Sequence, residues 1–143
     1  LEYRDVAEAS FSVQLSRNHP LLRETPFDFA KLKNYPYVAY TDGNGGNLNW
    51  TPWSSVVNPD KLIRVQSIAS RLSLVASTNA FSLVFPHSRA YNEANGVVTV
   101  PLPFDPLILG YIYSRDRGLG ETGEAYVRHL KERIREHFGE ESP

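Results

Sequence analysis

The sequence contains no cysteine, so disulfide bonds and thiolate metal sites are excluded by composition. It also lacks an excess of positive charge: the formal net charge is −1, whereas nucleic-acid binders usually carry clustered basic residues. No apolar run approaches the roughly 20 residues that a membrane helix needs. The stretch from Leu1 to Ser10 is charged, unlike the core of a signal peptide. We therefore expect no direct contact with DNA or membrane, and the cytoplasm as the default location.

The length and apolar content suit one compact unit. The chain has 143 residues, and its 41% hydrophobic content is enough for one core or two small lobes. No internal repeat or low-complexity tract interrupts it. Because the first residue is Leu1 and not methionine, we expect the chain to be an excised piece of a longer protein.

The first part of the chain predicts a strand, a short helix and a second strand. Phe11, Val13 and Leu15 alternate with polar residues, which is typical of a strand with one buried face. Asp28 can cap a short helix, and the β-prone stretch from Tyr37 to Tyr40 follows it.

The clearest unit predicts a strand, a helix and a strand between Leu62 and Phe85. The first strand covers Leu62 to Gln66, and Ser67 is placed to cap the helix that follows. That helix carries three apolar residues on one face: Ile68, Leu72 and Val75. The residues from Phe81 to Phe85 are too apolar for a half-solvated strand, so they predict a central strand of a parallel sheet.

The last third of the chain predicts two helices and two strands. A helix from Ser88 to Asn95 should end at Gly96, before a strand from Val97 to Val100. Leu107 to Tyr113 is again strand-like. The strongest helix of the sequence follows, with Thr122 as its expected cap, and its apolar stripe consists of Tyr126, Val127, Leu130, Ile134 and Phe138.

Two segments near the start form a distinctive pair: residues 17–21, Arg-Asn-His-Pro-Leu, and residues 29–36, Phe-Ala-Lys-Leu-Lys-Asn-Tyr-Pro. They resemble the passage where the effector domain of LysR-type bacterial transcription regulators enters its second lobe. Residues 74–77 leading to residues 83–86 look like the family's helix-to-strand segment, and residues 96–102 look like its return crossing. Order and spacing agree over most of the chain, and this consistency outweighs the weakness of each motif alone.

The resemblance implies an α/β fold like that of the type 2 periplasmic binding proteins. It implies a three-layer lobe with a mixed, mostly parallel sheet, plus the remnant of a second lobe. Residues 1–15 would be a crossing strand from lobe I, residues 16–100 the effector-binding lobe II, and residues 101–143 the return strand and C-terminal helix of lobe I. The family's N-terminal winged helix-turn-helix and the first part of lobe I would be missing.

One turn departs from the family pattern. Where the family usually has glycines between helix and strand, this chain reads Thr78-Asn79-Ala80. We therefore expect Asn79 to adopt the left-handed conformation, because asparagine is the next best residue for it.

Open α/β sheets bind ligands beyond the carboxyl ends of their strands, where helix N-termini offer free N–H groups. This rule selects the following ligand-binding candidates: Thr41, Asp42, Gln66, Ser67, Ser70, Phe85 and Pro86. Ser67 can equally be no more than a helix cap, and a cap can also contact a ligand.

Other candidate motifs favour structural interpretations. The loop Gly43 to Gly46 lacks the remaining residues of a dinucleotide or Walker fingerprint, so a turn is favoured over a phosphate site. Trp50 and Trp53 suit either core packing or the floor of a pocket. The histidines show no metal-ligand spacing, and we expect all of them near element ends or on solvated faces: His19, His87, His129 and His137.

The first functional hypothesis is a ligand sensor without catalysis, cofactor or metal. A small-molecule effector, expected to be an organic acid or similar polar metabolite, would bridge the lobes and change their closure. DNA would be contacted only through the missing N-terminal domain. The alternatives are a dimerisation module without its own ligand, since an incomplete lobe exposes apolar surface and strand edges, or a fragment of a solute-binding protein. No convergent acid, base or nucleophile supports an enzyme.

Overall fold

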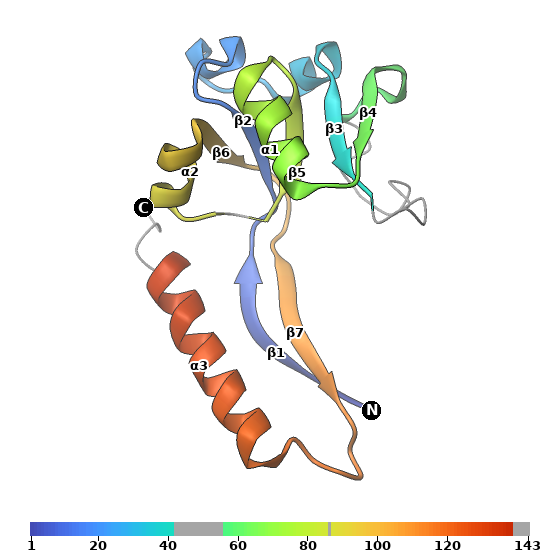
Figure 1. Ribbon diagram of the computed structural model, residues 1–143, viewed down its shortest axis with the longest axis vertical. Coiled ribbons are helices and arrows are strands. Elements are labelled where there is room, and N and C mark those ends of the chain that lie inside the picture. The colour runs from blue at the N-terminus through green and yellow to red at the C-terminus, as the bar shows by residue number, and fades with distance from the viewer. Residues whose placement is uncertain (42–55, 86, 139–143) are drawn as a thin grey trace.

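The computed structural model describes residues 1–41, 56–85 and 87–138. It consists of a sheet lobe and a long projection, which we call the stalk (Figure 1). The sheet lobe contains β2 (Ser12–Ser16), η1 (Pro20–Arg23), η2 (Phe29–Asn34), β3 (Tyr37–Tyr40), η5 (Pro59–Lys61), β4 (Leu62–Val65), α1 (Ile68–Ser77), β5 (Phe81–Val84), α2 (Arg89–Asn95) and β6 (Val97–Pro101). The stalk contains β1 (Glu2–Ala9), β7 (Leu107–Tyr113) and α3 (Gly120–Phe138).

The sheet of the lobe has five strands in the order β4-β3-β5-β2-β6. β3 is parallel to both β4 and β5, whereas β2 is antiparallel to both β5 and β6. Four strands therefore point one way and only β2 is reversed, which confirms the mixed, mostly parallel sheet. β5 is the third of the five strands and is buried throughout, as its apolar sequence predicts.

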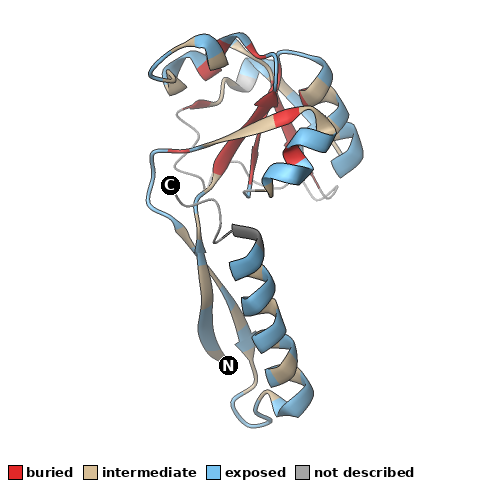
Figure 2. Cartoon of the chain, turned by 90° about the vertical axis from the view of Figure 1, so that its left-hand side faces the viewer, coloured by how far each residue is buried: buried red, intermediate tan, exposed pale blue. Residues whose placement is uncertain are grey.

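Two apolar clusters cover the two faces of the sheet. On one face Val13, Leu15 and Phe81 pack with Leu21 and Leu32, which come from the connecting segment with η1 and η2. On the other face a smaller cluster packs against α1, and its buried members are Val38, Val75, Ala80 and Val97. The lobe therefore has three layers, with the sheet in the middle, and the buried residues concentrate there (Figure 2).

β2 differs from its prediction as a half-solvated strand, because both of its faces are buried. Its alternating pattern is real, since Val13 and Leu15 lie in the larger cluster. The polar residues between them face the other layer and not solvent, and Gln14 is 0% exposed. The period-2 pattern therefore separates two buried environments here.

The helix α1 follows its prediction in part. Ser67 caps it by accepting a hydrogen bond from the Ser70 amide, and Val75 is fully buried. Ile68, predicted on the same face, is 55% exposed, so burial is limited to the later part of that face. The other residues of the first turn of α1, Ala69 and Ser70, are exposed as well.

The turn after α1 was also predicted incorrectly. No non-glycine residue among those described has a positive φ, so Asn79 does not adopt the left-handed conformation. Instead Thr78 ends the helix in an extended conformation, and its hydroxyl accepts a hydrogen bond from the Ala80 amide. Gly96 does adopt the left-handed conformation after α2, with φ 68°, as its position predicts.

The stalk pairs β1 with β7 in antiparallel register, and α3 packs beside them (Figures 1 and 2). α3 begins at Gly120, so Thr122 lies inside the helix and is not its cap. Tyr126 is 67% exposed and does not belong to the buried stripe. The half-buried residues of α3 include Gly123, Val127, Leu130 and Ile134, which recur at the spacing of one helix face.

His19 is a buried histidine, not a solvated one, although it does lie at an element end. Its Nδ1 accepts a hydrogen bond from the Leu21 amide and thereby caps η1. Its Nε2 lies 3.0 Å from the Asn79 carbonyl oxygen and must donate to it. Both bonds require the neutral ring with its proton on Nε2. Burial lowers the pKa of His19 below its ordinary value of 6.5, and the bond to Asn79 opposes this shift.

We expect His19 to make the fold sensitive to mild acid. A histidine whose folded pKa is lowered contributes stability above pH 6.5 and loses it as the pH falls towards the folded pKa. Urea unfolding should therefore give a lower midpoint at pH 5.5 than at pH 7.5, and His19→Asn should reduce that difference. His87, whose pKa is also lowered, should contribute to the pH difference that is left in His19→Asn. The control is His129→Asn, which removes an exposed histidine of α3 and should leave the pH difference unchanged. An unchanged pH difference in His19→Asn would contradict this role.

Candidate functional site

The carboxyl ends of β3, β4 and β5 meet at one edge of the sheet, which we call the carboxyl edge. Tyr37 is opposite Phe81 and Tyr40 is opposite Val65, so the three parallel strands end at a similar level. The arrowheads of β3 and β4 point towards the end of the lobe from which the stalk extends (Figure 1). Any ligand at this edge therefore lies on the same side of the lobe as the stalk.

Thr41 and the start of α1 come together at this edge. The amide of Thr41 donates to the Val65 carbonyl over 2.8 Å, which extends the β3–β4 ladder by one residue. Thr41 is buried, whereas Gln66, Ser67 and Ser70 are exposed. Because Gln66 directly follows Val65, the structure brings the candidates after β3 and β4 to adjacent strand ends.

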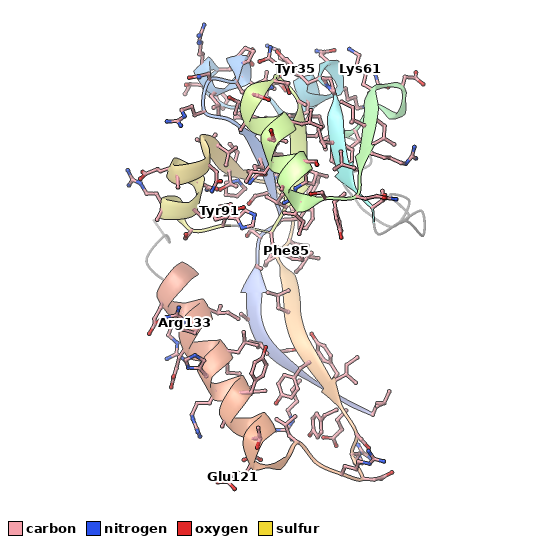
Figure 3. All side chains as sticks on the ribbon, in the orientation of Figure 1. Tyr35, Lys61, Phe85, Tyr91, Glu121 and Arg133 are labelled. Carbon is pink, nitrogen blue, oxygen red and sulfur yellow. The ribbon has the colours of Figure 1, made fainter. Side chains whose placement is uncertain are left out.

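Phe85 continues the same edge beyond β5, next to β3. Its ring is 45% exposed and packs edge-on against Phe11, with 5.0 Å between ring centroids. Phe11 lies between β1 and β2, where the chain passes from the stalk into the sheet lobe. An exposed aromatic ring beside the connection to the stalk is suited to contact a ligand and the stalk together. In Figure 3 the labelled Phe85 lies at this junction.

Two of the candidates, Asp42 and Pro86, lie outside the described residues. The same holds for the glycine-rich loop from Gly43 to Gly46 and for Trp50 and Trp53. Their contribution to the carboxyl edge stays a prediction.

Next to these candidates lies a polar group that the sequence analysis missed. Arg71 on α1 interacts electrostatically with Tyr91 on α2 and with His87 before α2. The rings of His87 and Tyr91 are 4.6 Å apart. Burial lowers the pKa of Arg71, and burial together with the charge of Arg71 lowers the pKa of His87. Arg71 is the one charged residue of α1. Its place on the sheet-facing side could have been noticed, since it precedes Val75 by four residues.

Neither metal binding nor membrane insertion gains support from the described residues. They contain no group of three or more histidine, aspartate or glutamate side chains that could hold a metal ion. None of their helices combines the length and the hydropathy of a membrane span.

The LysR substrate binding domain family model matches residues 1–135 of the chain. Among curated protein sequences, none is significantly similar to it.

Solved structures resemble this fold at low sequence identity. A probable transcriptional regulator from Pseudomonas aeruginosa is 22% identical with a TM-score of 0.64, and the alignment covers 92% of this chain and 44% of that one. HinK, a LysR family transcriptional regulator from the same organism, is 15% identical with a TM-score of 0.67, and the alignment covers 93% of this chain and 48% of that one. The BenM effector binding domain with its effector benzoate is 17% identical with a TM-score of 0.62 over 99% of this chain and 66% of that one.

These alignments leave a large part of each relative uncovered, because the chain spans between 44% and 66% of their lengths. Their identities are too low to carry more than the fold. The family model nevertheless matches nearly the whole chain, residues 1–135. The chain belongs to the LysR substrate binding domain family.

Proposed function

We propose that the chain is the effector-sensing part of a LysR-type transcription regulator, with no catalytic role. In this proposal a small metabolite, expected to be an organic acid, binds at the carboxyl edge and changes how the sheet lobe sits against the stalk. The change reaches DNA only through an N-terminal helix-turn-helix domain of the parent protein, in the cytoplasm. The division into a crossing strand over residues 1–15, lobe II over 16–100 and part of lobe I over 101–143 belongs to the same proposal.

The observation that carries this proposal is the position of the carboxyl edge relative to the two connections with the stalk. Ser12 is opposite both Val84 and Pro101, so β2 begins and β6 ends beside the carboxyl end of β5. Both connections to the stalk therefore leave the lobe at the edge where the candidate residues gather. A ligand that binds differently in two closures of this edge shifts the population between them.

The proposed ligand contacts combine one buried hydroxyl with several exposed polar groups. Thr41 offers its side chain from a buried position, while Gln66, Ser67 and Ser70 offer theirs from the open first turn of α1. Asp42 and Pro86 complete the proposed set, and Phe85 provides an apolar surface. This mixture of a few polar groups and an aromatic ring is typical of small-metabolite sites.

A second candidate function is self-association, favoured by the exposed apolar face of the stalk. Tyr3 and Ile112 are opposite each other in the β1–β7 register, and both are exposed. Ile108 lies on the same side of β7 and is exposed too. Within the described residues β1 and β7 have no other strand partner. Apolar faces and unpaired edges of this kind drive association, and a second copy of the chain would cover both.

We predict that thermal unfolding of the chain responds to small carboxylates. A panel of organic acids, sugars and organic bases should contain at least one acid that raises the melting temperature, since a ligand that binds only the folded state stabilises it. Thr41→Val should keep the fold, because the bond to Val65 comes from the Thr41 backbone, and should weaken binding roughly tenfold. Ser73→Ala, on the exposed side of α1, is the matched control. A flat response to acids together with a rise for sugars or bases would reject the acid effector.

Ser67 is predicted to stabilise the fold apart from any ligand contact. Its hydroxyl accepts from the Ser70 amide over 3.3 Å, so Ser67→Ala should lower the free energy of unfolding by about 1 kcal/mol. Ser67→Asn, which retains a capping side chain, should stay within a few tenths of a kcal/mol of the wild type. Equal stability of all three chains in urea titrations would show that the cap contributes nothing.

We predict that the chain is dimeric through the stalk. Ile112, which is 64% exposed, should be central to the contact, so Ile112→Glu should convert the dimer to a monomer in sedimentation velocity runs. Ile68→Glu places the same charge on an exposed apolar residue of the sheet lobe and should leave the dimer intact. A wild-type chain that sediments as a monomer at every practical concentration would remove this candidate function.

A further inference from the structure

The buried polar atoms without a hydrogen-bond partner gather in one region of the sheet lobe. Among the described residues, these atoms are Gln14 Nε2, Gln14 Oε1, Arg71 Nε, His87 Nε2 and Asn92 Oδ1. They come from β2, α1, α2 and the segment directly before α2. Buried polar atoms are normally paired, since each unpaired atom costs free energy. Five of them on neighbouring elements therefore indicate a missing partner.

Gln14 lies below the helix layer, in the middle of this region. In the sheet register it is opposite Ser82 on one side and Thr99 on the other. Opposite residues of antiparallel strands share a face. The Thr99 hydroxyl accepts from the Asn92 side-chain amide on α2, so this face is the one that α1 and α2 cover. The Ser82 hydroxyl donates to the Val38 carbonyl, and it therefore does not supply the donor that Gln14 Oε1 lacks.

Arg71 supplies a positive charge from the α1 side. It lies one turn before the fully buried Val75, which places both residues on the sheet-facing side of α1. It interacts electrostatically with Tyr91 on α2, with Tyr37 on β3 and with His87 directly before α2, so its charge lies between the helices and the sheet. The labelled Tyr91 extends from α2 towards the centre of the lobe, on the side where α1 lies (Figure 3).

No carboxylate neutralises Arg71 within the described part of the chain. The ion pairs there involve other cations, and the groups that act on Arg71 are tyrosine hydroxyls. An arginine stays charged in proteins. The Nε atom of Arg71 is buried, although the residue as a whole is only half-buried, and a charge drawn partly out of water without a counter-charge is unfavourable. Among the residues that the structure describes, the region is thus short of one negative charge and of hydrogen-bond partners at the same time.

We propose that a small oxyanion carrying at least one hydroxyl group, such as a hydroxycarboxylate or hydrogen phosphate, binds between α1 and α2 over Gln14. Arg71 neutralises its charge, and the Gln14 amide nitrogen donates to its oxygens. Gln14 Oε1 accepts the one hydrogen bond that the ligand's hydroxyl group can donate, which an oxyanion without O–H cannot supply. This site lies wholly within the sheet lobe and uses none of the carboxyl-edge residues, so it stands apart from the proposed effector function.

The test is calorimetric titration of the 143-residue chain with four sodium salts at constant ionic strength: phosphate, sulfate, glycolate and acetate. Phosphate should bind roughly tenfold more tightly than sulfate, and glycolate roughly tenfold more tightly than acetate, because only phosphate and glycolate carry a hydroxyl group. Arg71→Gln should weaken that binding at least tenfold, whereas Arg64→Gln, which removes an exposed arginine of β4, should change it less than twofold. Phosphate and glycolate distinguish an inorganic ligand from an organic one.

A second measurement does not depend on the variants. In the wild-type chain, the arginine Nε–H resonance that is missing from Arg71→Lys should shift saturably with the preferred salt. The proposal is overturned if no salt binds saturably, if Arg71→Gln and Arg64→Gln bind alike, or if the hydroxyl makes no difference to affinity. If none of the four salts binds to the wild-type chain but an organic acid still raises its melting temperature, this site is overturned and the proposed effector function is not.

Discussion

The reversed strand β2 is the constraint on which the rest of the structure depends. It lies between β5 and β6, is buried on both faces, and runs against every other strand of its sheet. Because β2 is reversed, its first residue lies at the carboxyl ends of its neighbours, and the chain must enter the lobe there. Since β6 ends at the same level, the chain also leaves there. The parallel strands, the candidate ligand residues and both connections to the stalk consequently share one edge.

In this arrangement a bound ligand can change the angle between the sheet lobe and the stalk directly, without a chain of intervening residues. A ligand at the carboxyl edge contacts residues directly beside the two connections, so its binding energy can depend on the angle between sheet lobe and stalk. The Phe11–Phe85 contact joins the first connection to the end of β5. The polar region over Gln14 lies further inside the lobe, two residue pairs beyond Ser12–Val84. Occupancy there would stabilise the packing of α1 and α2 on the sheet and not the angle of the stalk.

Much of the fold could be predicted from the sequence, because strands such as Tyr37 to Tyr40 and Phe81 to Val84 are specified by local apolar content. Caps were predictable where one side chain decides them, as at Asp28 and Ser67. The errors occur where tertiary context decides. Whether Gln14 faces solvent or a second layer depends on α1 and α2. The alternation of residues within β2 gives no information about these helices. The candidate residues after β3, β4 and β5 followed from a rule about sheet edges, whereas the Arg71 region needed the packing of two helices.

Native-state hydrogen exchange of the backbone amides tests the central role of β2 most directly. If β2 organises the lobe, the amides of Val13, Gln14 and Leu15 should exchange as slowly as those of β5, only through global unfolding. Amides of β1 and β7, which have one strand partner each in the described structure, should exchange at least about tenfold faster. Exchange of β2 at the rate of β1, ahead of β5, would contradict the account, because the reversed strand would then belong to the stalk and not to the core of the lobe.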